Sequence, residues 1–234
     1  MRWKIGLAFV VSVSLLQPVA GWAQGGYAFF NPEINWAGVM YYTVAGGPPH
    51  TCGDLWAKRN AGPWQKEAGG WLCTDGSGNA VKGPWSLNNQ AGDEKALVYI
   101  QWPSGSATTI ETHIWDKTAP SVTLASTTGT PPPSFSGTAT DPQWGAGFNS
   151  NWTECYATFR ENNTFSYWSP SRSRYDLGAA EFNCTITGMP GHSISWSVSP
   201  VPPASAHVPG YCYRWEVLIS DGGNWKAARK DFCY

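Results

Sequence analysis

Six cysteines constrain this chain of 234 residues more than any other feature of its sequence. They are Cys52, Cys73, Cys155, Cys184, Cys212 and Cys233. Their number is even, and no two lie two to four residues apart, so the spacing of a zinc knuckle is missing. The pattern therefore predicts disulfide bonds, which are typical of proteins that fold outside the reducing cytoplasm.

The N-terminal segment has the three-part layout of a secretory signal. Two cations come first, an apolar run covers residues 5–16, and the small residues Gly21 and Ala23 follow. The run is shorter than the about 20 residues that a membrane-spanning helix needs. We expect residues 1–23 to be removed, so that a bacterial secreted or periplasmic protein without membrane insertion begins at Gln24. The alternative is an uncleaved anchor.

The composition favours a polar, turn-rich β protein. Charged residues make up 13% of the chain and the net charge is −1, with no basic stripe, which argues against nucleic acid and anionic membranes as partners. Aromatic residues reach 15%, and 26 Gly and 18 Pro interrupt the sequence every few residues. This combination fits a β-rich extracellular module.

Alternating segments and turn clusters predict an all-β fold of two β-sandwich-like domains. Residues 96–102 and 108–115 read as a hairpin, and a fresh strand begins at Ser121. We therefore expect an N-terminal β-rich domain over residues 24–116 and a second domain over 117–234. The strands expected in the second domain are residues 121–126, 154–161, 164–168, 181–187, 193–199, 211–220 and 225–233. In the first domain residues 39–44 form a clear strand, whereas residues 48–92 read as loop-rich.

The last hairpin predicts one disulfide from its register. The turn Asp221–Asn224 and the pair Cys212 and Cys233 share the same midpoint in the sequence. Residues that share the midpoint of a hairpin face each other, which brings the two cysteines within bridging distance. Cys155 and Cys184 then pair by elimination, and Cys52 pairs with Cys73 inside the first half.

Three stretches of the second half are similar to bacterial immunoglobulin-like domains. The stretch 116–124 (DKTAPSVTL) resembles the opening strand of that family, residues 136–141 with 145–147 resemble the second strand and its loop, and residues 211–224 resemble the penultimate strand and final turn. The resemblance implies an immunoglobulin-like sandwich that serves as a module of surface adhesins or extracellular enzymes. Four cysteines and an apparent insertion over residues 165–183 depart from the pattern. The first half resembles no family that we can name.

No motif in the sequence carries a catalytic mechanism. The four histidines form no metal-binding pattern, and no Gly-x-Ser-x-Gly elbow is present. Asp75–Asn79 alternates oxygen-bearing side chains as calcium loops do, but it lacks the closing glutamate, so a glycine turn is the preferred interpretation. We expect no enzyme activity, no cofactor and no metal. Two converging carboxylates or a Ser–His pair would change that view.

Two aromatic clusters in predicted loops are the candidate ligand-binding residues. The first cluster contains Trp144, Phe148 and Trp152, and the second contains Tyr167, Trp168, Arg172 and Arg174. Exposed aromatic rings stack on ligands, and arginine forks bind carboxylate, sulfate or hydroxyl groups. The competing interpretation is that these rings fill a core, as we expect of Trp196 and Trp215.

The sequence thus favours an exported, non-enzymatic binding or adhesion protein that recognises an extracellular polysaccharide or a surface protein through its aromatic loops. One alternative is a structural or accessory subunit of a cell-surface assembly, in which the Trp-rich surface is buried against neighbours. Another is a secreted enzyme inhibitor that presents one disulfide-braced loop. Exposure of the aromatic loops, self-association and a single projecting loop would distinguish the three.

Overall fold

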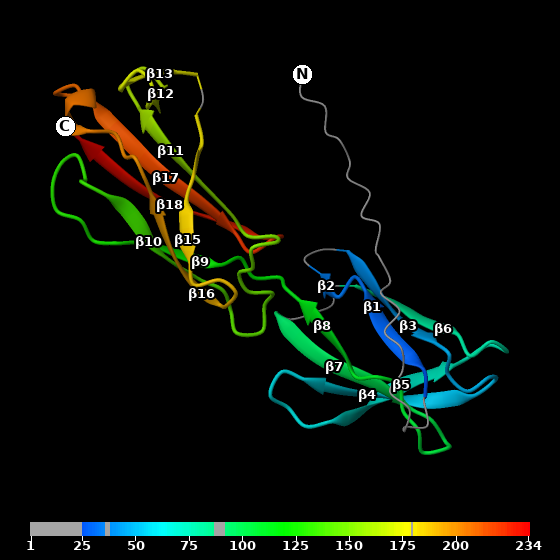
Figure 1. Cartoon of the computed structure of the whole chain (residues 1–234). Helices are drawn as coiled ribbons and strands as arrows, with labels where there is room; N and C mark the ends of the chain where they lie inside the picture. The colour runs from blue at the N-terminus through cyan, green and yellow to red at the C-terminus, as the bar shows by residue number, and fades with distance from the viewer. Residues whose placement is uncertain (1–24, 36–37, 87–91, 179) are drawn as a thin grey trace.

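The computed structural model describes residues 25–35, 38–86, 92–178 and 180–234 of the chain. The expected signal segment lies outside these residues. The described part contains β-strands and one short 3-10 helix, Ala204–Ala206, which confirms the all-β prediction. None of its helices is long and apolar enough to cross a membrane. Figure 1 shows the strands before and after Asp116 as two separate groups.

Two sheets form the N-terminal half. The first is antiparallel, in the order β1-β3-β6, and consists of β1 (Tyr27–Asn31), β3 (Val39–Ala45) and β6 (Ala80–Ser86). The second has the order β2-β8-β7-β4-β5 and consists of β2 (Ile34–Asn35), β8 (Glu111–Trp115), β7 (Glu94–Gln101), β4 (Cys52–Arg59) and β5 (Gln65–Cys73). Inward-facing residues of both sheets share one hydrophobic core, with Phe30 and Tyr42 opposite Val98 and Ile100. This half is therefore a β-sandwich.

The prediction that residues 48–92 are loop-rich is wrong, because β4, β5 and β6 lie within this range. The inward positions of these strands are often small, as at Gly53, Ala57 and Gly70, so the apolar alternation is weak in the sequence. At Gly53 the packing explains this choice, since a Cβ would lie 2.4 Å from Ile100 Cγ2. These strands form because large side chains of the neighbouring strand fill the core space that the small residues leave.

The C-terminal half is a second sandwich with the strand order of an immunoglobulin constant-type domain. One sheet has the order β15-β16-β10-β9, and the other has β13-β12-β11-β17-β18 with β14 beside β11. The first consists of β9 (Ser121–Leu124), β10 (Phe135–Thr140), β15 (Thr185–Thr187) and β16 (Ser193–Val198). The second consists of β11 (Glu154–Glu161), β12 (Ser166–Ser169), β13 (Arg174–Leu177), β14 (Phe182–Asn183), β17 (Cys212–Ser220) and β18 (Trp225–Cys233). The first sheet corresponds to the A-B-E-D sheet of that fold, and β11, β17 and β18 correspond to its C-F-G sheet, with β12, β13 and β14 as additional strands.

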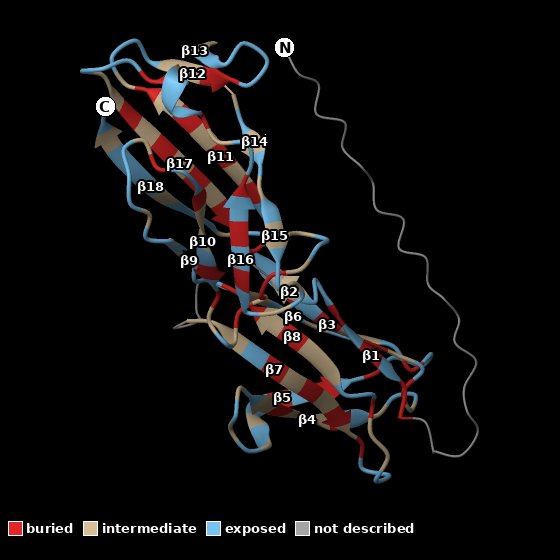
Figure 2. Cartoon of the chain, turned by 60° about the vertical axis from the view of Figure 1, so that its left-hand side comes forward, coloured by how far each residue is buried: buried red, intermediate tan, exposed pale blue. Residues whose placement is uncertain are grey.

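A tyrosine corner supports the same comparison. Tyr213 lies at the start of β17, and its hydroxyl oxygen accepts the backbone N–H of Val208 at 2.7 Å. In immunoglobulin folds a tyrosine near the start of the corresponding strand makes this upstream contact. Trp196 and Trp215 are buried in the core between the sheets, as expected. Figure 2 shows buried positions that alternate with exposed ones along β16 and with half-buried ones along most of β17.

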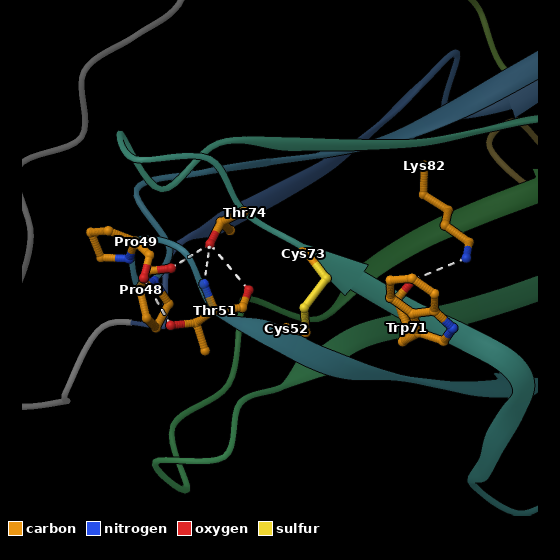
Figure 3. The surroundings of a disulfide bond; sticks show 8 residues. All are labelled: Pro48, Pro49, Thr51, Cys52, Trp71, Cys73, Thr74 and Lys82. Atoms are coloured by element: carbon orange, nitrogen blue, oxygen red, sulfur yellow. Dashed lines mark hydrogen bonds between the residues drawn. A yellow bond between two sulfur atoms is a disulfide. The ribbon is translucent and has the colours of Figure 1, made fainter.

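All three predicted disulfides are present. Cys212 faces Cys233 directly in the β17–β18 ladder, as the hairpin register predicted. Cys52 and Cys73 also face each other, across β4 and β5, and Figure 3 shows this bond beside the Thr74 hydroxyl that fixes the start of β4. Cys155 bonds to Cys184 and ties β11 to the segment between β14 and β15. Three disulfides are typical of a non-cytoplasmic protein.

Candidate functional site

The first predicted aromatic cluster does not form an exposed patch. Phe148 is 1% exposed and belongs to the hydrophobic core, so its assignment as a ligand-binding residue is wrong. The loop after β10 folds back because the backbone of Phe148 pairs with Gly191, and this pairing turns the ring inward. Trp144 and Trp152 are half-buried, and the indole N–H of Trp152 donates to the carbonyl of Gly147 at 3.1 Å.

The second predicted cluster is also divided by the fold. Trp168 is 3% exposed and packs against core aromatic rings, so it is not a ligand-binding residue either. Tyr167 is half-buried, whereas Arg172 and Arg174 are exposed. Both guanidinium groups bind Asp176, at 2.9 and 2.6 Å, and hold the pKa of that carboxyl below its usual range. An anionic ligand would have to compete with this internal partner.

An open groove of about 920 Å³ lies instead in the N-terminal half. Its aromatic side is built from Trp64 and Tyr99, whose rings meet edge to face at 5.0 Å, and Tyr27 adds a third ring. Tyr99 lies on the outer face of β7 and faces Trp56 of β4, with nearly parallel planes. The paired strands β4 and β7 thus fix the position of Tyr99, against which Trp64 of the β4–β5 connection packs.

Hydrogen bonds fix the opposite wall of the groove. This wall is the turn between β7 and β8, and the amide of Gln101 donates to the carbonyl of Ser106 at 3.0 Å. The buried hydroxyl of Thr108 accepts the backbone N–H of Ile100 at 2.9 Å and contacts the hydroxyl of Tyr42 at 3.2 Å. A rigid scaffold therefore presents the groove, which reduces the entropy cost of binding.

The chemistry of the groove is aromatic and neutral. Besides Tyr27, Trp64 and Tyr99, the described residues that line it are Gly25, Gly26, Gln101, Ser104, Gly105, Ser106, Ala107, Thr108, Thr109 and Ile110. None of them carries a charge. Flat rings beside hydroxyl and amide groups are suited to a neutral ligand that has both apolar faces and hydroxyl groups. The groove is not suited to a strongly anionic ligand.

An exposed aromatic face lies next to the groove. It is the outer face of the sheet β1-β3-β6, where Tyr27, Phe29, Tyr41 and Val81 are 51%, 46%, 39% and 62% exposed. Phe29 and Val81 flank Thr43 of β3 from opposite sides, so the residues form one surface. Contiguous exposed apolar surfaces of this kind mark interaction sites more often than isolated residues do.

Carboxylates also converge where the two halves join. One oxygen from each of Asp116, Asp141 and Asp221 lies within 4.8 Å of the others, and all three residues are buried. No metal was expected from the sequence, and the cluster could not be anticipated, because its residues are far apart in the chain. None of the three lines the groove. The Asp75–Asn79 segment is a turn, as predicted, with Asp75 accepting two backbone N–H groups.

The groove residues were not predicted from the sequence, because they come from separate segments of the chain. Tyr99 and Gln101 alternate with the buried residues of β7, so their exposure to the outer face could be read from the pattern. Trp64 belongs to the β4–β5 connection, which lies in the segment that read as loop-rich. Because strand β4 was not predicted, nothing in the sequence indicated that Trp64 and Tyr99 are in contact.

Comparisons with known proteins identify no family. No family model matches the sequence, and no curated protein matches it. Among solved structures, a tetra-tandem repeat in the extending region of a large adhesion protein is 12% identical, with a TM-score of 0.34 over 89% of this chain and 49% of that one. Chicken CNTN1 FN1–FN3 domains are 9% identical, with a TM-score of 0.28 over 91% and 64%.

A purple acid phosphatase from yellow lupin (Lupinus luteus) seeds is 11% identical, with a TM-score of 0.27 over 90% of this chain and 41% of that one. This chain therefore spans less than two thirds of each of the three structures. Matches at these TM-scores support no functional conclusion. The fold assignment rests on the strand order and the tyrosine corner, and the function rests on the site.

Proposed function

We propose that this protein is a non-enzymatic, exported binding protein that recognises a neutral polysaccharide or surface glycan in the groove beside Tyr27, Trp64 and Tyr99. The observation that carries the proposal is the uncharged aromatic and hydroxyl lining of this groove. Sugar rings present apolar faces that stack on aromatic side chains and hydroxyls that bind amide and hydroxyl groups. Three disulfides support a site of action outside the cytoplasm.

This proposal moves the binding site that the sequence suggested. The buried rings of Phe148 and Trp168 cannot stack on a ligand, and Arg172 and Arg174 already bind Asp176. The groove offers what those loops lack, namely rings on strands β1 and β7 and on the β4–β5 connection, with solvent-accessible space beside them. The remaining loop residues, Trp144, Trp152 and Tyr167, are half-buried and are kept as a second candidate surface for the same assay.

The test is binding of the oxidised protein to a panel of soluble glycans and insoluble polysaccharides, followed by pull-down and tryptophan fluorescence. We expect Trp64→Ala or Tyr99→Ala to weaken binding about 30-fold, because loss of an aromatic anchor costs about 2 kcal/mol. Trp152→Ala is the matched control, since it removes a half-buried tryptophan from the other half. A circular dichroism spectrum and a melting curve establish that each variant is folded.

Each result has a defined meaning. Loss of binding with Trp64→Ala but not with Trp152→Ala supports the groove. The reverse pattern returns the site to the loops of the C-terminal half and refutes the groove. Absence of binding to every glycan refutes carbohydrate recognition as the function.

A second candidate function is that of a structural or accessory subunit of a surface assembly. The exposed aromatic face of Tyr27, Phe29, Tyr41 and Val81 favours it, because a neighbouring subunit would cover these rings. Sedimentation velocity of the protein and of Phe29→Ser at increasing concentration tests self-association. Concentration-dependent oligomers that Phe29→Ser abolishes support this function, and a monomer throughout argues against self-assembly.

A further inference from the structure

Three chain segments meet at one buried point between the two halves. Asp116 directly follows β8, Asp141 directly follows β10, and Asp221 begins the turn between β17 and β18. The residues are 0%, 6% and 0% exposed, and one carboxylate oxygen from each lies within 4.8 Å of the other two. Asp141 has a side-chain exposure of 0%. The cluster is therefore enclosed by protein.

Backbone groups account for one oxygen of each carboxylate. Asp116 Oδ2 accepts the N–H of Ala146 at 2.8 Å, and Asp141 Oδ2 accepts the N–H of Gly147 at 2.8 Å. Asp221 Oδ1 accepts two N–H groups of its own turn. These contacts place the three carboxyl groups in fixed orientations toward one another.

Two of the remaining oxygens are orphaned. Asp141 Oδ1 and Asp221 Oδ2 are buried and have no hydrogen-bond partner. Buried polar atoms are almost always partnered, and a buried carboxylate without a partner is far more costly than a neutral group. The imidazole of His192, whose Nδ1 lies 3.6 Å from Asp141 Oδ2, is 44% exposed and reaches the oxygen that Gly147 already binds. The two orphaned oxygens therefore lack a positive partner among the described contacts.

The electrostatics of the cluster also favour a positive charge beside the carboxylates. The carboxylates of Asp116, Asp141 and Asp221 lie close together in a buried site, so negative charges on them would repel one another strongly. Like charges at this distance cannot all persist in a dry environment unless a proton or a cation neutralises them. Gly145 also lies against the cluster, where a Cβ would come within 2.5 Å of Asp141 Oδ2. The loop thus closes over the carboxylates because this residue has no side chain.

We propose that Asp116, Asp141 and Asp221 bind one calcium ion at the junction of the two halves. The donors are hard oxygen atoms without histidine or cysteine, which disfavours zinc and other soft or borderline metals. Magnesium keeps several waters in a strict octahedron and is seldom held by protein ligands alone. Calcium accepts six to eight oxygens in irregular geometry and combines carboxylates with backbone and amide carbonyls.

The ion would stiffen the connection between the halves. Asp116 is the first residue after the last strand of the N-terminal half, whereas Asp141 and Asp221 belong to opposite sheets of the C-terminal half. On the other side of the junction, Asp93 Oδ1 accepts the N–H groups of Lys117 and Thr118 at 2.7 and 2.8 Å. A cation at the cluster joins this connection to both sheets of the second sandwich. Calcium would thereby restrict the orientation of the groove relative to the C-terminal half.

The experiment compares melting of the full oxidised protein in calcium, in magnesium and in EDTA, with calcium binding measured by calorimetry. Calcium at about 100 times its dissociation constant should raise the Tm by about 5–10 °C. Asp141→Asn and Asp221→Asn should abolish most of this rise. Both variants remove a charge without changing shape, so in EDTA they should melt at or above the wild-type Tm.

Asp75→Asn is the matched control, because Asp75 also caps a glycine turn through backbone N–H groups but has an exposed carboxylate. Its effect on the Tm should be the same in calcium and in EDTA. A wild-type protein whose Tm and calorimetric trace do not respond to calcium overturns the proposal. So does a calcium-induced rise that Asp141→Asn and Asp221→Asn retain in full, and an equal rise with magnesium overturns the choice of calcium.

Discussion

The two cross-strand disulfides provide a quantitative test of how this fold is stabilised. Cys52–Cys73 and Cys212–Cys233 each close a sequence separation of 21 residues, and in each the two cysteines face each other across a hairpin. None of these four cysteines is buried, so replacing them with alanine leaves no cavity. The difference between oxidised protein and variant should then come mainly from the entropy of the unfolded chain.

That entropy has a calculable size. A cross-link that closes a loop of this length restricts the unfolded chain by about 3 kcal/mol at 25 °C. For sandwiches of this size the loss corresponds to a decrease in Tm of about 10 °C. The double variants Cys52→Ala with Cys73→Ala and Cys212→Ala with Cys233→Ala should therefore be destabilised by similar amounts. Differential scanning calorimetry and urea denaturation measure both.

The third disulfide differs from the other two in loop length and in burial. Cys155–Cys184 closes a longer separation, 29 residues, and Cys155 is 6% exposed and belongs to the core. Its removal should cost the chain-entropy contribution plus the cost of a partly filled cavity, so its Tm decrease should be the largest of the three. Losses of very different size for the two matched pairs, or no loss for either, would show that loop length does not set the stabilisation.

Three further predictions follow from local contacts. Tyr213→Phe deletes the hydroxyl that accepts the Val208 N–H and should cost about 1 kcal/mol in urea denaturation, with the strand order unchanged. Gly137→Ala places a Cβ 1.9 Å from the carbonyl oxygen of Thr123 and should reduce the yield of folded protein sharply, as a soluble-fraction assay would show. Burial lowers the pKa of His113 to about 4 from 6.5, so the unfolded state takes up a proton first as the pH falls, and stability is lost below about pH 6.5. The stability of wild type relative to His113→Leu should fall by about 2 kcal/mol between pH 7 and pH 5, and an unchanged difference would contradict this assignment.

Local patterns in the sequence predicted much of the fold. The strand at residues 154–161 and the strand at residues 225–233 begin and end where they were expected. The Cys212–Cys233 pairing followed from hairpin register, because the turn fixes which residues face each other. These features depend on neighbours close in the chain, and the sequence contains the information directly.

Other features escaped prediction because their neighbours are distant in the chain. Strand β4 is defined by its contacts with β7, where Ile100 fills the space that Gly53 leaves. The burial of Phe148 depends on a backbone bridge to Gly191, more than forty residues away. An aromatic residue in a polar loop therefore looks the same in the sequence whether it binds a ligand or closes a core.

Strand alternation, turn chemistry and cysteine count are local or compositional properties, so the all-β class, the three disulfides and the expectation of export could be read from the sequence. Tertiary structure alone decided which aromatic rings remain accessible, since burial depends on the packing of strands from separate segments. It also brought Asp116, Asp141 and Asp221 together, although the chain separates them by many residues. A site built from distant segments exists only after the sheets have packed, and for that reason the groove and the carboxylate cluster were visible only in the folded chain.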